Sequence, residues 1–157
     1  MPERLIRKAK LADIGKVHRM VNYYADTKGN LLPRSIAELS EHIRDFVVAE
    51  EDEQLLGCCA LHIVWDDLGE VRSLVVEESA QGRHIGEALL LSAIKEAQDL
   101  GLPKLFVLTY IPDFFCKYGF EVVNKSKLPH KIWSECIRCP KFPDCDEVAL
   151  ILDLSRT

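Results

Sequence analysis

The pattern of apolar and polar residues predicts a chain built from short strands and amphipathic helices. Short apolar runs bounded by turn-forming residues predict strands at 5–9, 46–50, 55–65, 70–77, 104–109, 120–123 and 147–154. Apolar residues at helical spacing predict helices over 14–21, 35–44, 85–100 and 112–118.

Several helix boundaries carry residues that suit helix ends. Asp13 is placed to cap the first turn of the helix over 14–21. Ser35 and Glu38 form a capping box, in which each side chain accepts a hydrogen bond from the main chain of the other. Gly101 follows the last periodic residue of the helix over 85–100 and is expected to end it.

The order of these elements indicates the fold class. Three strands between 46 and 77 follow one another through turns at 52–54 and 66–69, which predicts an antiparallel meander. The strand at 70–77, the helix over 85–100 and the strand at 104–109 then predict a strand–helix–strand crossover. We therefore expect a mixed α/β domain, and the absence of a linker predicts one domain over residues 1–157.

Composition excludes several classes of protein. Apolar residues make up 48% and charged residues 29% of the 157 residues, which argues against disorder. A formal net charge of −5 disfavours broad binding of nucleic acid. There is no run of about 18 apolar residues to span a membrane and no apolar signal core near the start, so we expect a cytoplasmic protein. In that compartment the six cysteines indicate reduced thiols or metal ligands rather than disulfides.

The passage from strand to helix at 74–88 is the sharpest chemical feature. Unpaired main-chain N–H groups at a helix start bind anions, and Gly82 and Gly86 would let a phosphate approach the main chain closely. Arg83 adds a positive charge. The alternative is an ordinary capped turn. The candidate residues for this site are Leu74, Val75, Val76, Gln81, Gly82, Arg83, His84, Ile85, Gly86, Glu87 and Ala88.

This passage resembles a known family. Residues 81–86, Gln-Gly-Arg-His-Ile-Gly, are similar to the Q/R-x-x-G-x-G/A signature of the GNAT N-acetyltransferases, whose loop amides hold the pyrophosphate of acetyl-CoA. Residues 114–120 are similar to the F-Y-x-x-x-G-F segment of that superfamily. The resemblance implies the GNAT fold, with a central, mostly antiparallel sheet flanked by helices, and acetyl-CoA as co-substrate.

A narrower resemblance covers nearly the whole chain. Segments 31–35, 46–50, 57–61, 70–76 and 105–109 are similar to the acetyltransferase domain of bacterial N-acetylglutamate synthases, in its short, stand-alone form. Three positions depart from the wider patterns. His84 replaces a signature glycine, Phe115 replaces the tyrosine that many GNAT enzymes use as general acid, and an acidic segment at 143–147 replaces a basic run of the synthases. The synthases share the phenylalanine, and the resemblance places Phe115 at the cofactor.

The resemblance assigns roles in acetyl transfer. Glu70 is the candidate base for the acceptor amine, and a main-chain N–H of Val75 or Val76 would polarise the thioester carbonyl. Thr109 and Tyr110 are candidates for protonating the thiolate, with Tyr118 as a third choice. Each of these side chains also has a plain structural interpretation, Glu70 as an exposed carboxylate at a strand edge.

An amino-acid acceptor carries a carboxylate, so a cation must face it. Arg34 matches the Arg-Ser of the synthase loop and is the first candidate, and Arg72 is the second. Lys131 lies in a stretch, 127–133, that resembles the segment covering the substrate in the synthases. Arg72 is equally well explained as a solvated surface charge.

The cysteines and the other histidines could form a zinc site or could be structural residues. Cys136, Cys139 and Cys145, with His130 or Cys116, have the spacing of a zinc site, but a second C-x-x-C is missing and we expect no required metal. Cys58 and Cys59 lie in an apolar strand and are expected in the core, and His62 is expected to be a hydrogen-bonded strand histidine.

These observations predict an acetyltransferase that acts on the α-amine of an amino acid, glutamate first and glutamine second, by direct attack in a ternary complex. That activity would stand at the entry to arginine synthesis. Partners other than acetyl-CoA and the amino acid are not expected, apart from a second copy of the chain, since relatives form dimers. Two alternatives stay open: an acetyltransferase with another amine acceptor, such as a polyamine, a small-molecule amine or a protein N-terminus, and a non-catalytic regulator that binds acyl-CoA.

Overall fold

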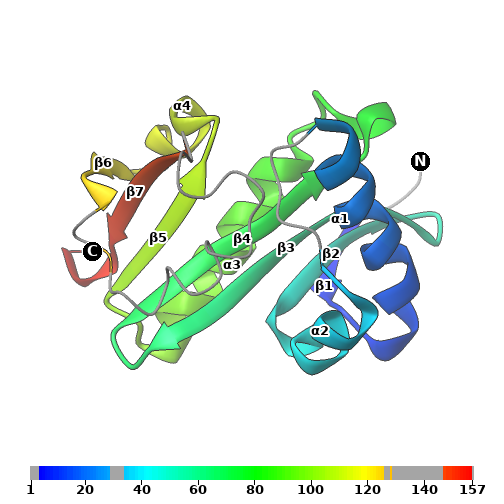
Figure 1. Cartoon of the computed structure of the whole chain (residues 1–157), viewed down its shortest axis with the longest axis horizontal. Coiled ribbons are helices and arrows are strands. Elements are labelled where there is room, and N and C mark those ends of the chain that lie inside the picture. The colour runs from blue at the N-terminus through cyan, green and yellow to red at the C-terminus, as the bar shows by residue number, and fades with distance from the viewer. Residues whose placement is uncertain (1–3, 29–33, 126–127, 129–146, 157) are drawn as a thin grey trace.

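The centre of the molecule is a sheet of seven strands in the order β1-β2-β3-β4-β5-β7-β6 (Figure 1). A computed structural model describes residues 4–28, 34–125, 128 and 147–156. The strands are β1 Arg4–Lys8, β2 Phe46–Glu51, β3 Gln54–Trp65, β4 Leu68–Val76, β5 Lys104–Thr109, β6 Glu121–Val123 and β7 Val148–Asp153. The helices are α1 Ile14–Lys28, α2 Ile36–Glu41, α3 Ile85–Leu100 and α4 Pro112–Cys116.

The pairing of the strands confirms the predicted fold class. Strands β1 to β4 form an antiparallel meander, and β4 pairs in parallel with β5 after the crossover through α3. Strand β7 then inserts between β5 and β6, antiparallel to both. The result is a mixed sheet with one parallel pair near its middle.

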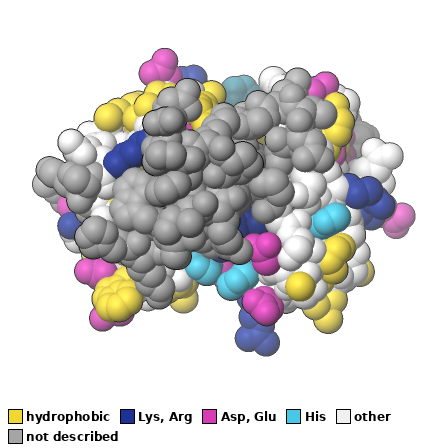
Figure 2. Space-filling view, viewed as in Figure 1, with side chains coloured by type: hydrophobic (Ala, Val, Ile, Leu, Met, Phe, Trp, Pro, Cys, Tyr) yellow, Lys and Arg dark blue, Asp and Glu magenta, His cyan; other side chains and the backbone are white. Residues whose placement is uncertain are grey.

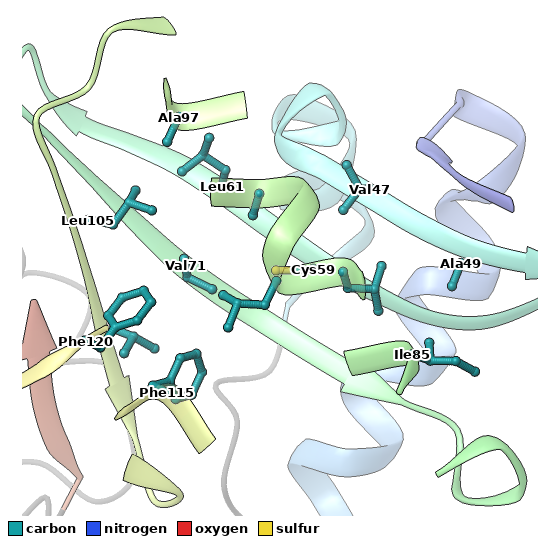
Figure 3. Packing of buried hydrophobic residues seen from close by; sticks show 14 of the residues in the cluster. Val47, Ala49, Cys59, Leu61, Val71, Ile85, Ala97, Leu105, Phe115 and Phe120 are labelled. Atoms are coloured by element: carbon teal, nitrogen blue, oxygen red, sulfur yellow. The ribbon is translucent and has the colours of Figure 1, made fainter. Parts of the chain in front are cut away.

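Helices cover both faces of the sheet (Figure 1). Helix α3 packs on one face through buried residues such as Leu89, Ala93 and Ala97, which meet inward-facing residues of the strands. Figure 3 shows part of this cluster, with Phe115 and Phe120 beside each other at one end. Helices α1 and α2 cover the other face, where Val17 and Val21 lie among a second buried cluster.

A bulge in β4 changes which face its side chains point to. Cys58 pairs with Val75 but Ala60 pairs with Arg72, so β4 contains one residue more than β3 over this stretch. Ser73 takes up the extra residue with φ of +56°. As a result Val71 packs in the cluster under α3, whereas Val75, four residues later, packs in the cluster under α1.

Strands β4 and β5 then separate. Their ladder consists of the pairs Gly69–Leu105 and Glu70–Phe106, at the start of both strands. Beyond Glu70 the edge of β4 that faces β5 has lost its ladder partner, which opens the sheet between two neighbouring strands.

Several predicted helix boundaries differ from the structure, for example those of α1, which runs to Lys28, and of α4, which ends at Cys116. Helix α2 ends at Glu41, and a separate 3-10 turn covers 43–45, where the sequence predicted a helix to about Arg44. Asp13 does not open α1 as its cap. It ends a 3-10 turn over 11–13, and its carboxylate accepts a hydrogen bond from the Lys10 N–H at 2.7 Å and pairs with Arg7 at 2.8 Å.

Candidate active site

A cavity of about 360 Å³ lies where β4 and β5 separate. Its walls come from β4, from the end of β5 and the segment leading into α4, and from Tyr24 of α1. The predicted site residues that line it are Arg72, Leu74, Val75, Val76, Gln81, Gly86, Thr109, Tyr110 and Phe115. The open strand edge and the predicted anion-binding loop therefore meet in one place.

The loop between β4 and α3 has a defined conformation. The side-chain amide of Gln81 donates to the main-chain carbonyl of Val76 at 3.2 Å and ties the loop to the end of β4. Gly82 has φ of +83° and His84 has φ of +63°. A left-handed conformation costs a residue with a Cβ about 1 kcal/mol, so His84 occupies a position that suits glycine better.

The start of α3 presents unpaired main-chain donors. Its first helical hydrogen bond runs from the Ala88 N–H to the His84 carbonyl at 3.1 Å. By helix geometry the N–H groups of Ile85, Gly86 and Glu87 have no carbonyl one turn earlier to bind. Gly86 lines the cavity without a side chain, so an anion could reach these donors closely.

Arg83 is anchored to the edge of the sheet. Its guanidinium pairs with Glu51 at 2.5 Å, and Arg4 donates to its main-chain carbonyl at 2.8 Å. The Arg83 side chain is 45% exposed, so the charge also faces solvent. The positive charge expected beside the phosphate is thus shared with Glu51.

Glu70 and Arg72 lie next to each other on β4. Nη1 of Arg72 lies 3.6 Å from Oε1 of Glu70. The Arg72 side chain is 10% exposed and the Glu70 side chain is 14% exposed. Glu70 forms the last ladder pair with β5, immediately before the cavity wall begins at Val71. The candidate base therefore lies at the point where the sheet opens.

Arg34 is held in place by Asn22 of α1. The Asn22 side chain accepts from the Arg34 N–H at 3.0 Å and donates to the Arg34 carbonyl at 2.7 Å. The Arg34 side chain is 9% exposed and lies 3.6 Å from Glu38. Arg34 and Arg72 line one small cavity together with Ser73, although they are far apart in the sequence.

The candidates for protonating the thiolate differ in their surroundings. Thr109 is buried, and its hydroxyl accepts a hydrogen bond from the Ile111 N–H at 3.0 Å, which leaves its own hydrogen available to donate. Tyr110 lines the same cavity. Tyr118 packs edge-on against Phe114, and desolvation together with the Glu87 carboxylate raises its pKa.

Phe115 belongs mainly to the core. It is 3% exposed, stacks on Phe114 at 5.1 Å and packs edge-on against Phe120 at 5.5 Å. It also forms part of the cavity wall, so it can contact a bound cofactor only through its ring.

Tyr24 is a cavity residue that the sequence analysis missed. It falls on the buried stripe of α1 after Val17 and Val21, so its spacing predicts a core residue. Its hydroxyl is buried and makes no hydrogen bond of ordinary geometry among the described residues, although the main chain of Glu78 lies near it. Burial and the nearby Glu77 carboxylate raise the pKa of Tyr24, so the hydroxyl stays protonated at neutral pH.

His62 is hydrogen-bonded, as predicted. Its Nδ1 lies 2.8 Å from Oδ2 of Asp45, and the His42 ring packs edge-on against it at 5.1 Å. These side chains lie on the face of the sheet that carries α1 and α2. Figure 2 shows histidine and acidic side chains side by side on that face.

The described cysteines fit the predicted core placement. Cys58 and Cys59 are completely buried, and burial raises both thiol pKa values, that of Cys59 to about 12. Cys116 is exposed. The candidates Lys131, His130, Cys136, Cys139 and Cys145 lie outside the described residues. Among the described residues no helix is long and apolar enough to cross a membrane.

Comparison with known proteins agrees with this geometry. Residues 17–120 match the model of the acetyltransferase (GNAT) family. An N-acetyltransferase of Chlorobaculum tepidum is 39% identical over 95% of this chain and 96% of its own length. An amino-acid acetyltransferase of Mycobacterium tuberculosis is 32% identical over 96% of this chain and 85% of its own length.

Solved structures show the same fold. The N-acetylglutamate synthase of Neisseria gonorrhoeae, in complex with coenzyme A and N-acetyl-glutamate, superposes with a TM-score of 0.86 and 29% identity over 97% of this chain. The match covers 35% of the synthase, so this chain spans about a third of its length. A Mycobacterium tuberculosis protein in complex with CoA superposes with a TM-score of 0.80 and 28% identity over 96% of this chain and 99% of its own length.

Proposed function

The chain belongs to the GNAT family of acetyltransferases, which use acetyl-CoA, and from this premise we propose that it acetylates the α-amino group of glutamate or glutamine. Glutamate is the first choice. The reaction would then supply the acetylated amino acid with which arginine synthesis begins. Action in the cytoplasm and assembly as a homodimer stay predictions from the sequence.

The observation that carries this proposal is the convergence of two cations on one cavity. Arg34 and Arg72 line one cavity of about 10 Å³, which Glu38 and Asp45 also line, and both arginine side chains are nearly buried. This small cavity adjoins the larger one, because Arg72 and Ser73 line both. A buried guanidinium is suited to a planar carboxylate, which it can bind through two parallel hydrogen bonds. Amino-acid acetyltransferases among the relatives and a synthase structure that holds N-acetyl-glutamate support the same acceptor class.

The cavity between β4 and β5 fits an acyl-pantetheine arm. The open edge of β4 offers main-chain groups that can pair with amides of the arm, and the start of α3 offers donors for the diphosphate. Both features belong to the main chain. A site of this kind needs no metal for acyl transfer.

Different residues of the site would carry out the separate steps of acetyl transfer. Glu70, directly or through a water, would take the proton that the acceptor amine must lose before it attacks. The main-chain N–H of Val75 or Val76 would stabilise the negative charge that develops on the carbonyl oxygen. Thr109 or Tyr110 would return a proton to the sulfur as the C–S bond breaks. The attack is direct, so no covalent enzyme intermediate forms.

The acidic segment at 143–147 would suit a cationic acceptor better, so the test includes one. The experiment measures release of free CoA thiol from acetyl-CoA with glutamate, glutamine, other amino acids, a polyamine and a peptide. We expect turnover with glutamate or glutamine. Turnover with only the polyamine or the peptide would contradict the proposed acceptor, and CoA binding without any turnover would contradict catalysis.

A further inference from the structure

His62 and Glu70 lie directly opposite each other on neighbouring strands. His62 of β3 is the ladder partner of Glu70 of β4, and directly opposed residues of an antiparallel pair lie on the same face of the sheet. The faces agree with this, because the neighbours Leu61 and Val71 both pack in the cluster under α3 on the other side. The candidate base therefore has an imidazole as its cross-strand neighbour.

The contact with Asp45 fixes which nitrogen of His62 can accept a proton. An ionised carboxylate only accepts hydrogen bonds, so the Nδ1 of His62, at 2.8 Å from Asp45, carries the hydrogen. In the neutral imidazole Nε2 is then the proton acceptor.

The exposed fractions of the two side chains indicate the direction in which a proton would move. The Glu70 side chain is 14% exposed and that of His62 is 24% exposed, so the imidazole has the better access to solvent. A base that takes a proton in every turnover must lose it again before the next one. His62, the more exposed of the two, is therefore a group on this face that could carry such a proton toward solvent.

We propose that His62, oriented by Asp45, relays the proton of the acceptor amine from Glu70 to solvent. The amine gives one proton to the Glu70 carboxylate, the protonated carboxyl passes it to Nε2 of His62, and the imidazolium releases it to water or buffer. His62 acts through Glu70 and is a positioning and relay residue that does not touch the substrate. The inference rests on the proposed acetyl transfer with Glu70 as base.

The charged groups around His62 come from two elements. Asp45 and His42 face it from the 3-10 turn over 43–45 and the residue before it, and Glu70 faces it from β4. Arg72 lies 3.6 Å from Glu70 on the same strand. Of the two histidines, His62 is the one opposite Glu70.

The test compares variants of the intact chain in the thiol-release assay. In His62→Asn the amide can still donate to Asp45 from the position of Nδ1, but it cannot accept and pass on a proton. We expect its kcat to fall about 10-fold or more, since acid–base steps contribute factors of this size. The KM for acetyl-CoA should stay unchanged.

Rescue by imidazole separates a proton relay from a structural role. In His62→Ala the side-chain site is open to solvent, so about 50 mM imidazole should raise kcat several-fold, with no such gain in Glu70→Gln. An unchanged kcat in His62→Asn, or the absence of any rescue in His62→Ala, would overturn the relay. If the unmodified protein itself fails to acetylate any amino acid, the proposed function fails instead.

Discussion

Replacing Arg34 by alanine tests the acceptor site most directly. The side chain is 9% exposed and contacts Glu38 at 3.6 Å, so a carboxylate bound to it would be shielded from water. A charge-assisted hydrogen bond in such a place contributes about 1.5–3 kcal/mol, which corresponds to a rise of roughly 10- to 150-fold in the KM for the amino acid. Loss of Arg34 also leaves the Glu38 carboxylate to repel the substrate, which favours the upper part of that range.

The structure predicts that this change acts on one substrate alone. Asn22 holds the main chain at residue 34 through its N–H and its carbonyl, and both hydrogen bonds remain in the alanine variant. Steady-state kinetics with each substrate varied in turn would show a raised KM for glutamate and an unchanged KM for acetyl-CoA. Arg44→Ala, at an exposed arginine of the neighbouring 3-10 turn, is the control. An unchanged KM for the amino acid, or equal loss of both substrates, would refute the role given to Arg34.

Three further outcomes follow from the described contacts. Glu70→Gln should lower kcat by about 100-fold or more, while calorimetry shows unchanged CoA affinity; retention of full activity would exclude Glu70 as the base. His84→Gly should raise the free energy of unfolding by about 0.5–1 kcal/mol in urea titrations, because the left-handed conformation at φ +63° suits glycine, and a loss of stability would contradict this. Asp13→Asn should lower the free energy of unfolding by about 2 kcal/mol at pH 7, through loss of the ion pair with Arg7. Since this pair holds the pKa of Asp13 below its usual value of 3.8, the difference should persist at pH 5 and shrink as the pH falls below about 4; a difference independent of pH would exclude the charge as its cause.

The parts of the fold that local patterns determine could be predicted from the sequence. Helix α3 covers 85–100 as expected, and Gly101 ends it with φ of +83°. The insertion of β7 between β5 and β6 could not be predicted, because the sequence between 123 and 148 carries no signal for which strand it joins. The bulge at Ser73 could not be predicted either, because a serine in the sequence does not indicate a left-handed conformation.

In the candidate site, too, the parts formed by contiguous residues could be predicted, and the parts formed by long-range contacts could not. The loop at 81–86 is contiguous in the sequence, so its residues could be recognised together. The contacts that organise the acceptor side join residues that are distant in sequence. Asn22 binds residue 34, and Asp45 binds His62, 17 residues later. Periodicity places Tyr24 on the buried stripe of α1, yet only the packing of α1 against β4 shows that it lines a cavity.

The extra residue in β4 could be removed without exchanging the two cores. Without Ser73 a regular ladder with β3 would place Leu74 opposite Cys59 and leave Val75 opposite Cys58. Leu74 would then stay in the cluster beneath α3, and Val75 would stay in the cluster beneath α1. A loss of one codon here would therefore straighten the strand beside the cavity, where Ser73 lies, and would change the shape of the site before it changed the packing of either core.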